Sequence, residues 1–208
     1  LAVEYFEKRP YANQNDVERY GRAVAYQRAG RYWEALDIFK ELLDKDKSVI
    51  AYHIGLGQVL VALDQPRDAL LTYERALALF PRNVPLVLDY GEQLLKFGQA
   101  PKAHAMLLDL MNNVPPTPEQ VRLIARAASE AGEEAEAFYY LSEYRLMIGD
   151  LTGGIGYLQQ ALRLPKLQEI QRIRFQARID FIREFMTEEQ LKMMPRDKPV
   201  GTSARNVN

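Results

Sequence analysis

Small and large apolar positions recur along this chain with a period of 34 residues. One alanine marks each of four consecutive units: Ala35, Ala69, Ala103 and Ala137. A large apolar residue follows each alanine by four positions: Phe39, Tyr73, Leu107 and Leu141. A second small residue precedes each alanine by twelve positions: Ala23, Gly57, Gly91 and Ala125. A fixed period of this length indicates a repeat architecture.

The pattern inside each unit predicts two antiparallel helices that cross closely at the small residues. A larger side chain at the crossing would push the helix axes apart. The large residue four positions further lies on the same helix face and fills the space beside the crossing. Each first helix is expected to end where a left-handed backbone is cheap, at Gly30, Asp64, Gly98 and Gly132.

This spacing resembles the tetratricopeptide repeat (TPR), for which "RYGRAVAYQRAGRYWEALDIFKELL" is a good example. The resemblance predicts an all-α solenoid of about ten or eleven antiparallel helices over residues 1–186. A generic helical bundle would not keep one register over four units. The expected repeats are 16–49, 50–83, 84–117, 118–148 and 135–166.

The overlap of the last two ranges is a prediction that one helix serves two repeats. Gly149 follows Gly132 by only 17 positions and starts a fifth motif, in which Gly154 takes the place of a crossing residue. The shared helix must then pack on both sides, and its sequence "AFYYLSEYRLMIG" is apolar almost all the way round. Because a lone buried carboxylate is costly, we expect Glu143 to pair with Arg174 or Arg178.

The two ends of the chain are expected to differ from the repeats. Residues 1–9 align with second helices, so they are expected to be the second helix of a truncated repeat. Residues 167–186 are expected to form a capping helix with a polar outer face. Its apolar residues at helical spacing are Ile170, Ile173, Ala177, Phe181 and Phe185. Residues 187–208 lack periodicity and are expected to be largely disordered.

The composition and motifs argue against chemistry in this chain. There is no cysteine, which excludes disulfides and a thiolate metal site. With a net charge of −1, the chain lacks the excess of positive charge that is typical of proteins that bind nucleic acid or anionic membranes. The sequence contains no HExxH, phosphate loop or nucleophile elbow, and no apolar run approaches the roughly 20 residues of a membrane span. We therefore predict no catalytic residue, no cofactor and no metal, with His53 and His104 in packing or surface roles.

A scaffold of this kind binds other proteins, and its groove is lined by first-helix positions that do not pack inward. The mixture of charges and apolar groups there suits an extended or partly unfolded polypeptide. The predicted groove residues are Tyr20, Val24, Gln27, Arg28, Ile54, Gln58, Val61, Leu88, Asp89, Glu92, Lys96, Arg122 and Arg126. Tyr20 and Val24 stand where TPR co-chaperones that bind a terminal carboxylate have lysine and asparagine, so that clamp is not expected.

Three segments resemble the C-terminal region of periplasmic zinc metalloproteases of the β-barrel assembly-enhancing type. They are "YFEKRPYANQNDVERYGRAVAYQRAGRYWEAL", "EAFYYLSEYRLMIGDLTGGIGYLQQALRL" and "RFQARIDFIREF". The resemblance covers roughly residues 1–186. It implies a periplasmic parent with an HExxH zinc domain and a repeat domain that engages the outer-membrane assembly machinery and its substrates. No zinc ligand or catalytic glutamate of that family falls in this chain.

Two functions remain open on the sequence. The first is a substrate- and partner-binding domain of an outer-membrane quality-control protease. The second is a stand-alone adaptor that joins proteins in an assembly without a protease. The oligomeric state is not determined by these patterns.

Overall fold

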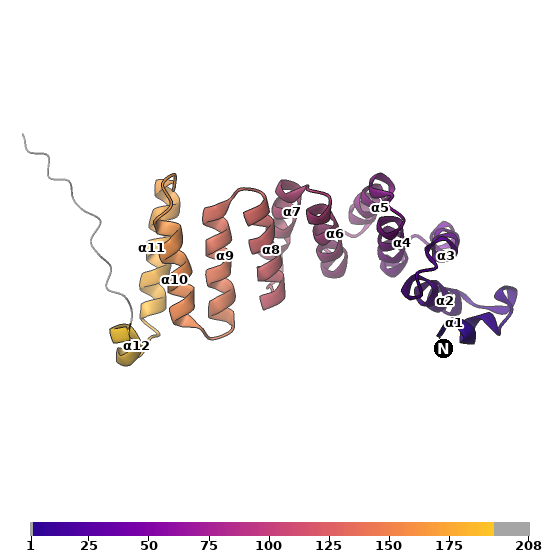
Figure 1. Ribbon diagram of the computed structural model, residues 1–208, viewed down its shortest axis with the longest axis horizontal. Coiled ribbons are helices and arrows are strands. Elements are labelled where there is room, and N and C mark those ends of the chain that lie inside the picture. Colours follow the sequence, from indigo (N-terminus) through magenta and orange to yellow (C-terminus); the bar gives the residue numbers. More distant parts are fainter. Residues whose placement is uncertain (1, 194–208) are drawn as a thin grey trace, which may run out of the picture. The chain divides into compact units, whose positions relative to one another are not determined.

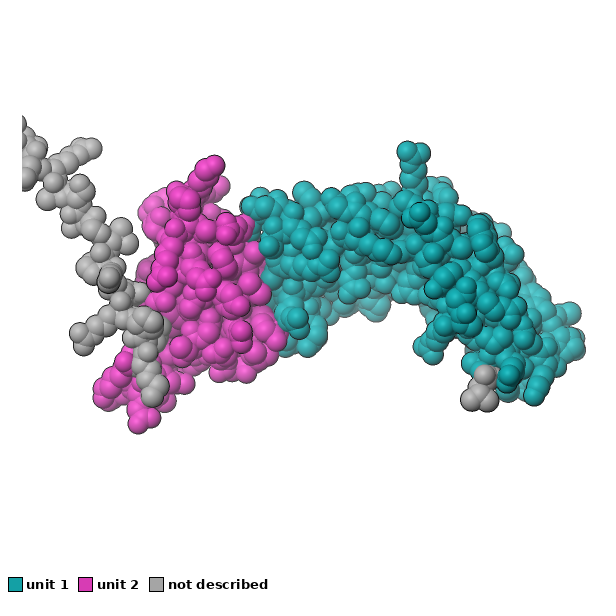
Figure 2. Space-filling model, in the orientation of Figure 1, with its two compact units in different colours: residues 1–133 teal, residues 134–208 magenta. Residues whose placement is uncertain are grey.

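The computed structural model describes residues 2–193, and this part of the chain consists of helices without strands. It divides into two compact units, residues 1–133 and 134–208 (Figure 2). The helices of the first unit are α1 (Ala2–Glu7), α2 (Asp16–Arg28), α3 (Tyr32–Lys45), α4 (Ile50–Ala62), α5 (Pro66–Leu79), α6 (Val84–Lys96), α7 (Ala100–Asn113) and α8 (Pro118–Glu130) (Figure 1). A 3-10 turn, Tyr11–Asn13, joins α1 to α2.

In the first unit, successive helices pair as the 34-residue period predicts. Helices α2 and α3, α4 and α5, and α6 and α7 form three hairpins within the predicted repeats 16–49, 50–83 and 84–117. Each hairpin also packs against the next helix in the chain, and α4 contacts both α2 and α6. The predicted TPR-like solenoid fold is confirmed.

The small residues lie where the helices cross. Ala35, Ala69 and Ala103 are completely buried. A Cβ atom added at Gly57 would lie 2.5 Å from Cζ of Tyr73, too close for any real side chain. Tyr73 is itself fully buried, so its ring occupies the space that glycine leaves open. The contact is specific to this crossing, since the equivalent Gly91 meets the flexible end of Leu107 at 3.3 Å.

The first helices end in left-handed turns at the predicted positions. Backbone φ is 76° at Gly30, 56° at Asp64, 70° at Gly98 and 82° at Gly132. In each turn the amide of the next residue reaches back to the last helical turn, as from Gln99 N to Leu94 O at 2.8 Å. This is the hydrogen bond of a Schellman cap. It reverses the chain within the three residues between the helices and allows the second helix to return along the first.

The second unit contains α9 (Glu134–Met147), α10 (Leu151–Leu162), α11 (Glu169–Arg183) and α12 (Glu188–Met193). Ala137 on α9 is buried. Gly154 is a crossing residue as predicted, because an added Cβ would lie 2.8 Å from Cδ2 of Leu146 on α9. Helix α9 therefore serves as the first helix of the motif that begins at Gly149. Its second role, in the repeat predicted at 118–148, stays a prediction.

Glu143 is paired as predicted, and its partner is Arg178. Both carboxylate oxygens of Glu143 accept hydrogen bonds from the Arg178 guanidinium at 2.8 Å. The hydrogen bonds to Glu143 raise the pKa of Arg178. Arg174 instead contacts Glu136, at 2.6 and 2.7 Å. Two ion pairs thus join α11 to α9, one turn apart on α11 and two turns apart on α9.

The prediction that the capping helix has a polar outer face is wrong, because that face carries several large apolar side chains. Phe175, Ile179, Ile182 and Met186 form the buried face of the segment around α11. Ile170, Ile173, Phe181 and Phe185 are 49–74% exposed, and Ala177 is exposed as well. The sequence carries two apolar stripes at helical spacing, and only packing against α10 decides which stripe is buried.

The predicted disordered tail is also corrected in part. Residues 188–193 form α12, which brings the helices in the described residues to twelve. A capping box explains the start of this helix, since Thr187 and Gln190 exchange hydrogen bonds at 2.9 and 3.3 Å. The rest of the predicted tail, residues 194–208, lies outside the described residues.

We predict opposite effects for two glycine substitutions that face equally open space. No heavy atom lies within 4 Å of a Cβ added at Gly98 or at Gly156. Gly98→Ala places an L side chain at φ 70° and should lower the free energy of unfolding by about 1 kcal/mol. Gly156→Ala, inside α10, should raise it by about 1 kcal/mol. Urea denaturation measures both values, and two changes of the same sign would contradict the assignment of the turn.

A second prediction concerns the ion pair between Glu143 and Arg178, whose side chains are 22% and 31% exposed. Arg178→Met should lower the free energy of unfolding by about 1 kcal/mol, because it leaves a half-buried carboxylate unpaired. Lys102→Met breaks a pair with Glu74 whose side chains are both 47% exposed, and should cost less than about 0.5 kcal/mol. Adding Glu143→Met to the first variant should restore part of the loss. Equal costs for the two single variants would show that partial burial gives the Glu143–Arg178 pair no more stability than an exposed ion pair has.

Candidate functional site

The thirteen predicted groove residues lie on the first helices of the repeats, and none of them is buried. Eight are half-buried and five are exposed. The exposed ones are Arg28, Glu92, Lys96, Arg122 and Arg126. These positions are therefore available to a partner, although exposure alone does not identify one.

Six of the thirteen gather around one cavity between α2 and α4. The cavity has a volume of about 470 Å³. Its predicted lining residues are Tyr20, Val24, Gln27, Arg28, Ile54 and Gln58. Three further lining residues, Phe39, Ala51 and Gly55, were not predicted as part of the groove.

Gly55 explains how the cavity is kept open. A Cβ added at Gly55 would overlap the ring of Phe39, so this glycine gives the ring its place under the cavity. Tyr20 stands edge-on to Phe39, with the ring centroids 6.1 Å apart. The signal that could have revealed this is the doublet "GLG" in α4, in which only Gly57 has a crossing position to explain it.

Polar side chains connect three first helices along the groove. The Gln27 amide donates to Oε1 of Gln58 at 2.9 Å, and the Gln58 amide donates to Oδ1 of Asp89 at 3.0 Å. The three residues are successively 31 positions apart, three fewer than the 34-residue period. Each therefore lies about one helical turn nearer the start of its helix than the residue before it, on α2, α4 and α6 in turn. We call this row, Gln27–Gln58–Asp89, the amide ladder.

Tyr73 holds Asp89, the last residue of the amide ladder, in position. Its hydroxyl donates to the second carboxylate oxygen of Asp89. Burial, and then the nearby negative charge of Asp89, raise the pKa of Tyr73 far above its usual range. The phenol therefore stays protonated as a donor. Its ring stacks on Tyr90 at 5.2 Å, so the packing of the second repeat holds Asp89 in place.

The remaining seven predicted groove residues do not line this cavity: Val61, Leu88, Asp89, Glu92, Lys96, Arg122 and Arg126. Asp89 joins the site through the amide ladder. Arg126 is engaged by Glu130 on its own helix at 2.7 Å. Val61 packs partly against the core of the first unit. The cavity thus lies at the first two repeats, and the amide ladder reaches the third at Asp89. Binding by the other predicted groove residues stays a prediction.

The described residues contain neither a cluster of metal ligands nor a helix that could span a membrane. Within residues 2–193 no three His, Asp or Glu side chains come together as metal ligands would. His53 is buried and bonds the Lys47 carbonyl at 2.9 Å, with its ring against Phe80. None of the helices in this part is both long and apolar enough to span a bilayer.

Residues 60–127 match the family described as "Tetratricopeptide repeat". Among curated proteins, the chain is 24% identical over 165 residues to the Beta-barrel assembly-enhancing protease of Yersinia pestis. That match covers 79% of this chain but only 34% of the protease. The chain therefore spans about a third of the length of this relative.

Solved structures show the same fold. A tetratricopeptide repeat protein from Parabacteroides merdae has a TM-score of 0.55 and 12% identity, with 87% of this chain and 76% of that chain covered. The MamA protein of AMB-1 has a TM-score of 0.55 and 18% identity, with 87% and 98% covered. At these identities the likeness establishes the architecture, a TPR-like solenoid, and not a shared partner.

Proposed function

We propose that the chain binds extended or partly unfolded polypeptides through the cavity between α2 and α4 and the adjoining amide ladder. We further propose that it does so as the interaction domain of a larger periplasmic zinc metalloprotease, in the assembly and quality control of outer-membrane proteins. The zinc and the catalytic residues would then belong to another part of the parent protein. The match to the assembly-enhancing protease supports this second step.

The observation that carries the first step is the combination of a partly apolar cavity with the amide ladder. Val24 and Ile54 line the cavity and would contact an apolar side chain of the ligand. Its volume of about 470 Å³ falls in the range of binding pockets and can hold such a side chain. Burial of one large aliphatic or aromatic side chain contributes about 1.5–3 kcal/mol.

The amide ladder would read the main chain of the same ligand. Gln27 and Gln58 each carry donors and an acceptor, and their mutual hydrogen bonds use only part of this capacity. Main-chain groups of an extended peptide can therefore add to the ladder without breaking it. Arg28 lies at the cavity edge, is exposed and has no ion pair within the described residues. It favours ligands with an acidic group beside the apolar side chain.

The same groove would serve a stand-alone scaffold, the second candidate function. The site is complete within residues 1–133 and needs no other domain for its geometry. The full gene distinguishes the two: an HExxH motif encoded upstream supports the protease, and a gene without one supports the scaffold.

We predict that a charge placed in the cavity abolishes most of the binding. Val24→Arg, on α2, fills the cavity and should weaken binding of an unfolded polypeptide by about tenfold. Val17→Arg is the matched control, because Val17 lies on the same helix, is 77% exposed and does not line the cavity. Fluorescence anisotropy with labelled, carboxymethylated lactalbumin measures both affinities.

Circular dichroism checks that both variants fold. Equal affinities for Val24→Arg and Val17→Arg would overturn the site. Photo-crosslinkers at Arg28, Glu92 and Arg126 test the cellular context, and the expected captured species are outer-membrane proteins or their assembly machinery. If neither is captured, the proposed role in outer-membrane protein assembly is overturned, whereas the proposed binding of unfolded polypeptides in the groove is not affected.

A further inference from the structure

A second cavity lies on another face of α4, away from the groove. It has a volume of about 470 Å³ and is formed by α3, α4, α5 and the loop between α3 and α4. Helix α4 presents Ile54 and Gln58 to the groove, whereas His53 and Leu56 line this second cavity. We call it the outer cavity.

The outer cavity combines an apolar lining with an excess of positive charge. Its aliphatic walls come from Leu43, Leu56 and Leu79. The cations on its lining are Lys40, Lys47 and Arg75, and Asp44 is the one acid among the lining residues. In the described part of the chain none of the three cations forms an ion pair. The chain as a whole carries a net charge of −1, so this excess is local.

His53 fixes the backbone of the loop that carries one of these cations, Lys47. Its Nε2 bonds the main-chain carbonyl of Lys47 at 2.9 Å, and its ring stands edge-on to Phe80 at 5.9 Å. The loop between α3 and α4 is therefore tied to α4 at the residue that carries the charge. The ammonium group of Lys47 itself has no partner within residues 2–193 and is exposed.

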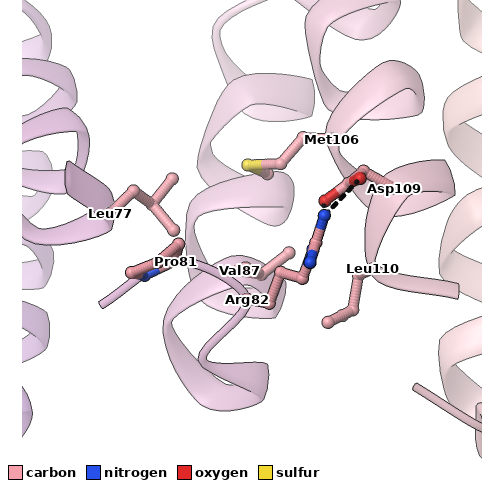
Figure 3. A pocket seen from close by; sticks show the side chains of 7 residues that line it. All are labelled: Leu77, Pro81, Arg82, Val87, Met106, Asp109 and Leu110. Atoms are coloured by element: carbon pink, nitrogen blue, oxygen red, sulfur yellow. Dashed lines mark hydrogen bonds and ion pairs between the residues drawn. The ribbon is translucent and has the colours of Figure 1, made fainter. Parts of the chain in front are cut away.

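The next repeat provides an internal comparison. A cavity of about 370 Å³ occupies the corresponding place between α5, α6 and α7 (Figure 3). Lining residues of the two cavities correspond at 34-residue spacing: Leu43 and Leu77, Lys47 and Pro81, His53 and Val87, Thr72 and Met106, Arg75 and Asp109.

The cavity between α5, α6 and α7 has no excess of positive charge on its lining. Proline and an acid replace Lys47 and Arg75, and Lys40 corresponds to Glu74. The one cation on its lining, Arg82, is neutralised by Asp109 at 3.0 Å, as Figure 3 shows. The solenoid can therefore build this place without unpaired cations, so packing does not explain the three at the outer cavity.

We propose that the outer cavity binds an acidic peptide segment in which carboxylates flank an apolar side chain. The leucine walls would take the side chain, and the three cations would face the carboxylates. A small inorganic anion would satisfy the cations but leave the apolar walls uncovered. The site is separate from the proposed groove, and a ligand here need not displace a polypeptide there.

The test is a titration of the isotope-labelled chain with acetyl-Leu-Glu-Leu-Glu-Leu-amide, followed by amide chemical shifts. We expect shifts around Lys47 and Thr72, and an affinity that falls as sodium chloride is added. Lys40→Gln, Lys47→Gln and Arg75→Gln together should weaken binding by about tenfold. The control variant Lys8→Gln, Arg163→Gln and Lys166→Gln removes the same charge from other exposed positions and should bind normally.

Three results would overturn the proposal. They are equal loss in the two triple variants, peptide binding unchanged when the glutamates are replaced by glutamines, and inorganic phosphate binding as tightly as the peptide. The triple variant of the outer cavity should still bind unfolded lactalbumin as the wild type does. Failure of the groove would be seen with lactalbumin alone, so the two proposals fail separately.

Discussion

The close crossing of paired helices at small residues is the constraint on which the rest of this structure depends. At Gly57 there is no room for a Cβ, because the ring of Tyr73 already occupies that space. Packing at this density leaves no freedom in the separation of the two helices. The same tyrosine then reaches the groove, where its hydroxyl fixes Asp89. The packing of one repeat thereby sets the position of a polar group that faces a partner.

One helix can present different chemistry on different faces because the repeat uses only part of its surface for packing. Helix α4 buries Gly57 and Val59, faces the groove with Ile54 and Gln58, and lines the outer cavity with Leu56. The repeat fixes the backbone, and the exposed positions are free to differ between units. Comparing repeats within one chain thus separates residues needed for the fold from residues that it does not require.

The sequence predicted the turns and the crossings well because both depend on local chemistry. A left-handed turn needs glycine or a tolerated substitute, and Asp64 was identified by register alone. The partner of Glu143 was narrowed to two arginines by charge and spacing, and geometry selected Arg178. The part of the cavity formed by Gly55 and Phe39 was not predicted, because the role of that glycine depends on a ring sixteen residues earlier in the chain.

The sequence by itself determined the repeat, its register and the residues at the helix crossings, since each follows from side-chain size at a fixed period. Only the tertiary structure decided which apolar stripe of α11 is buried. Phe175 and Ile179 face the core while Ile173 and Phe181 face solvent. Both stripes have the same spacing, so helical periodicity cannot distinguish them. Which stripe is buried depends on the surface of the neighbouring helix, because only one stripe can pack against it.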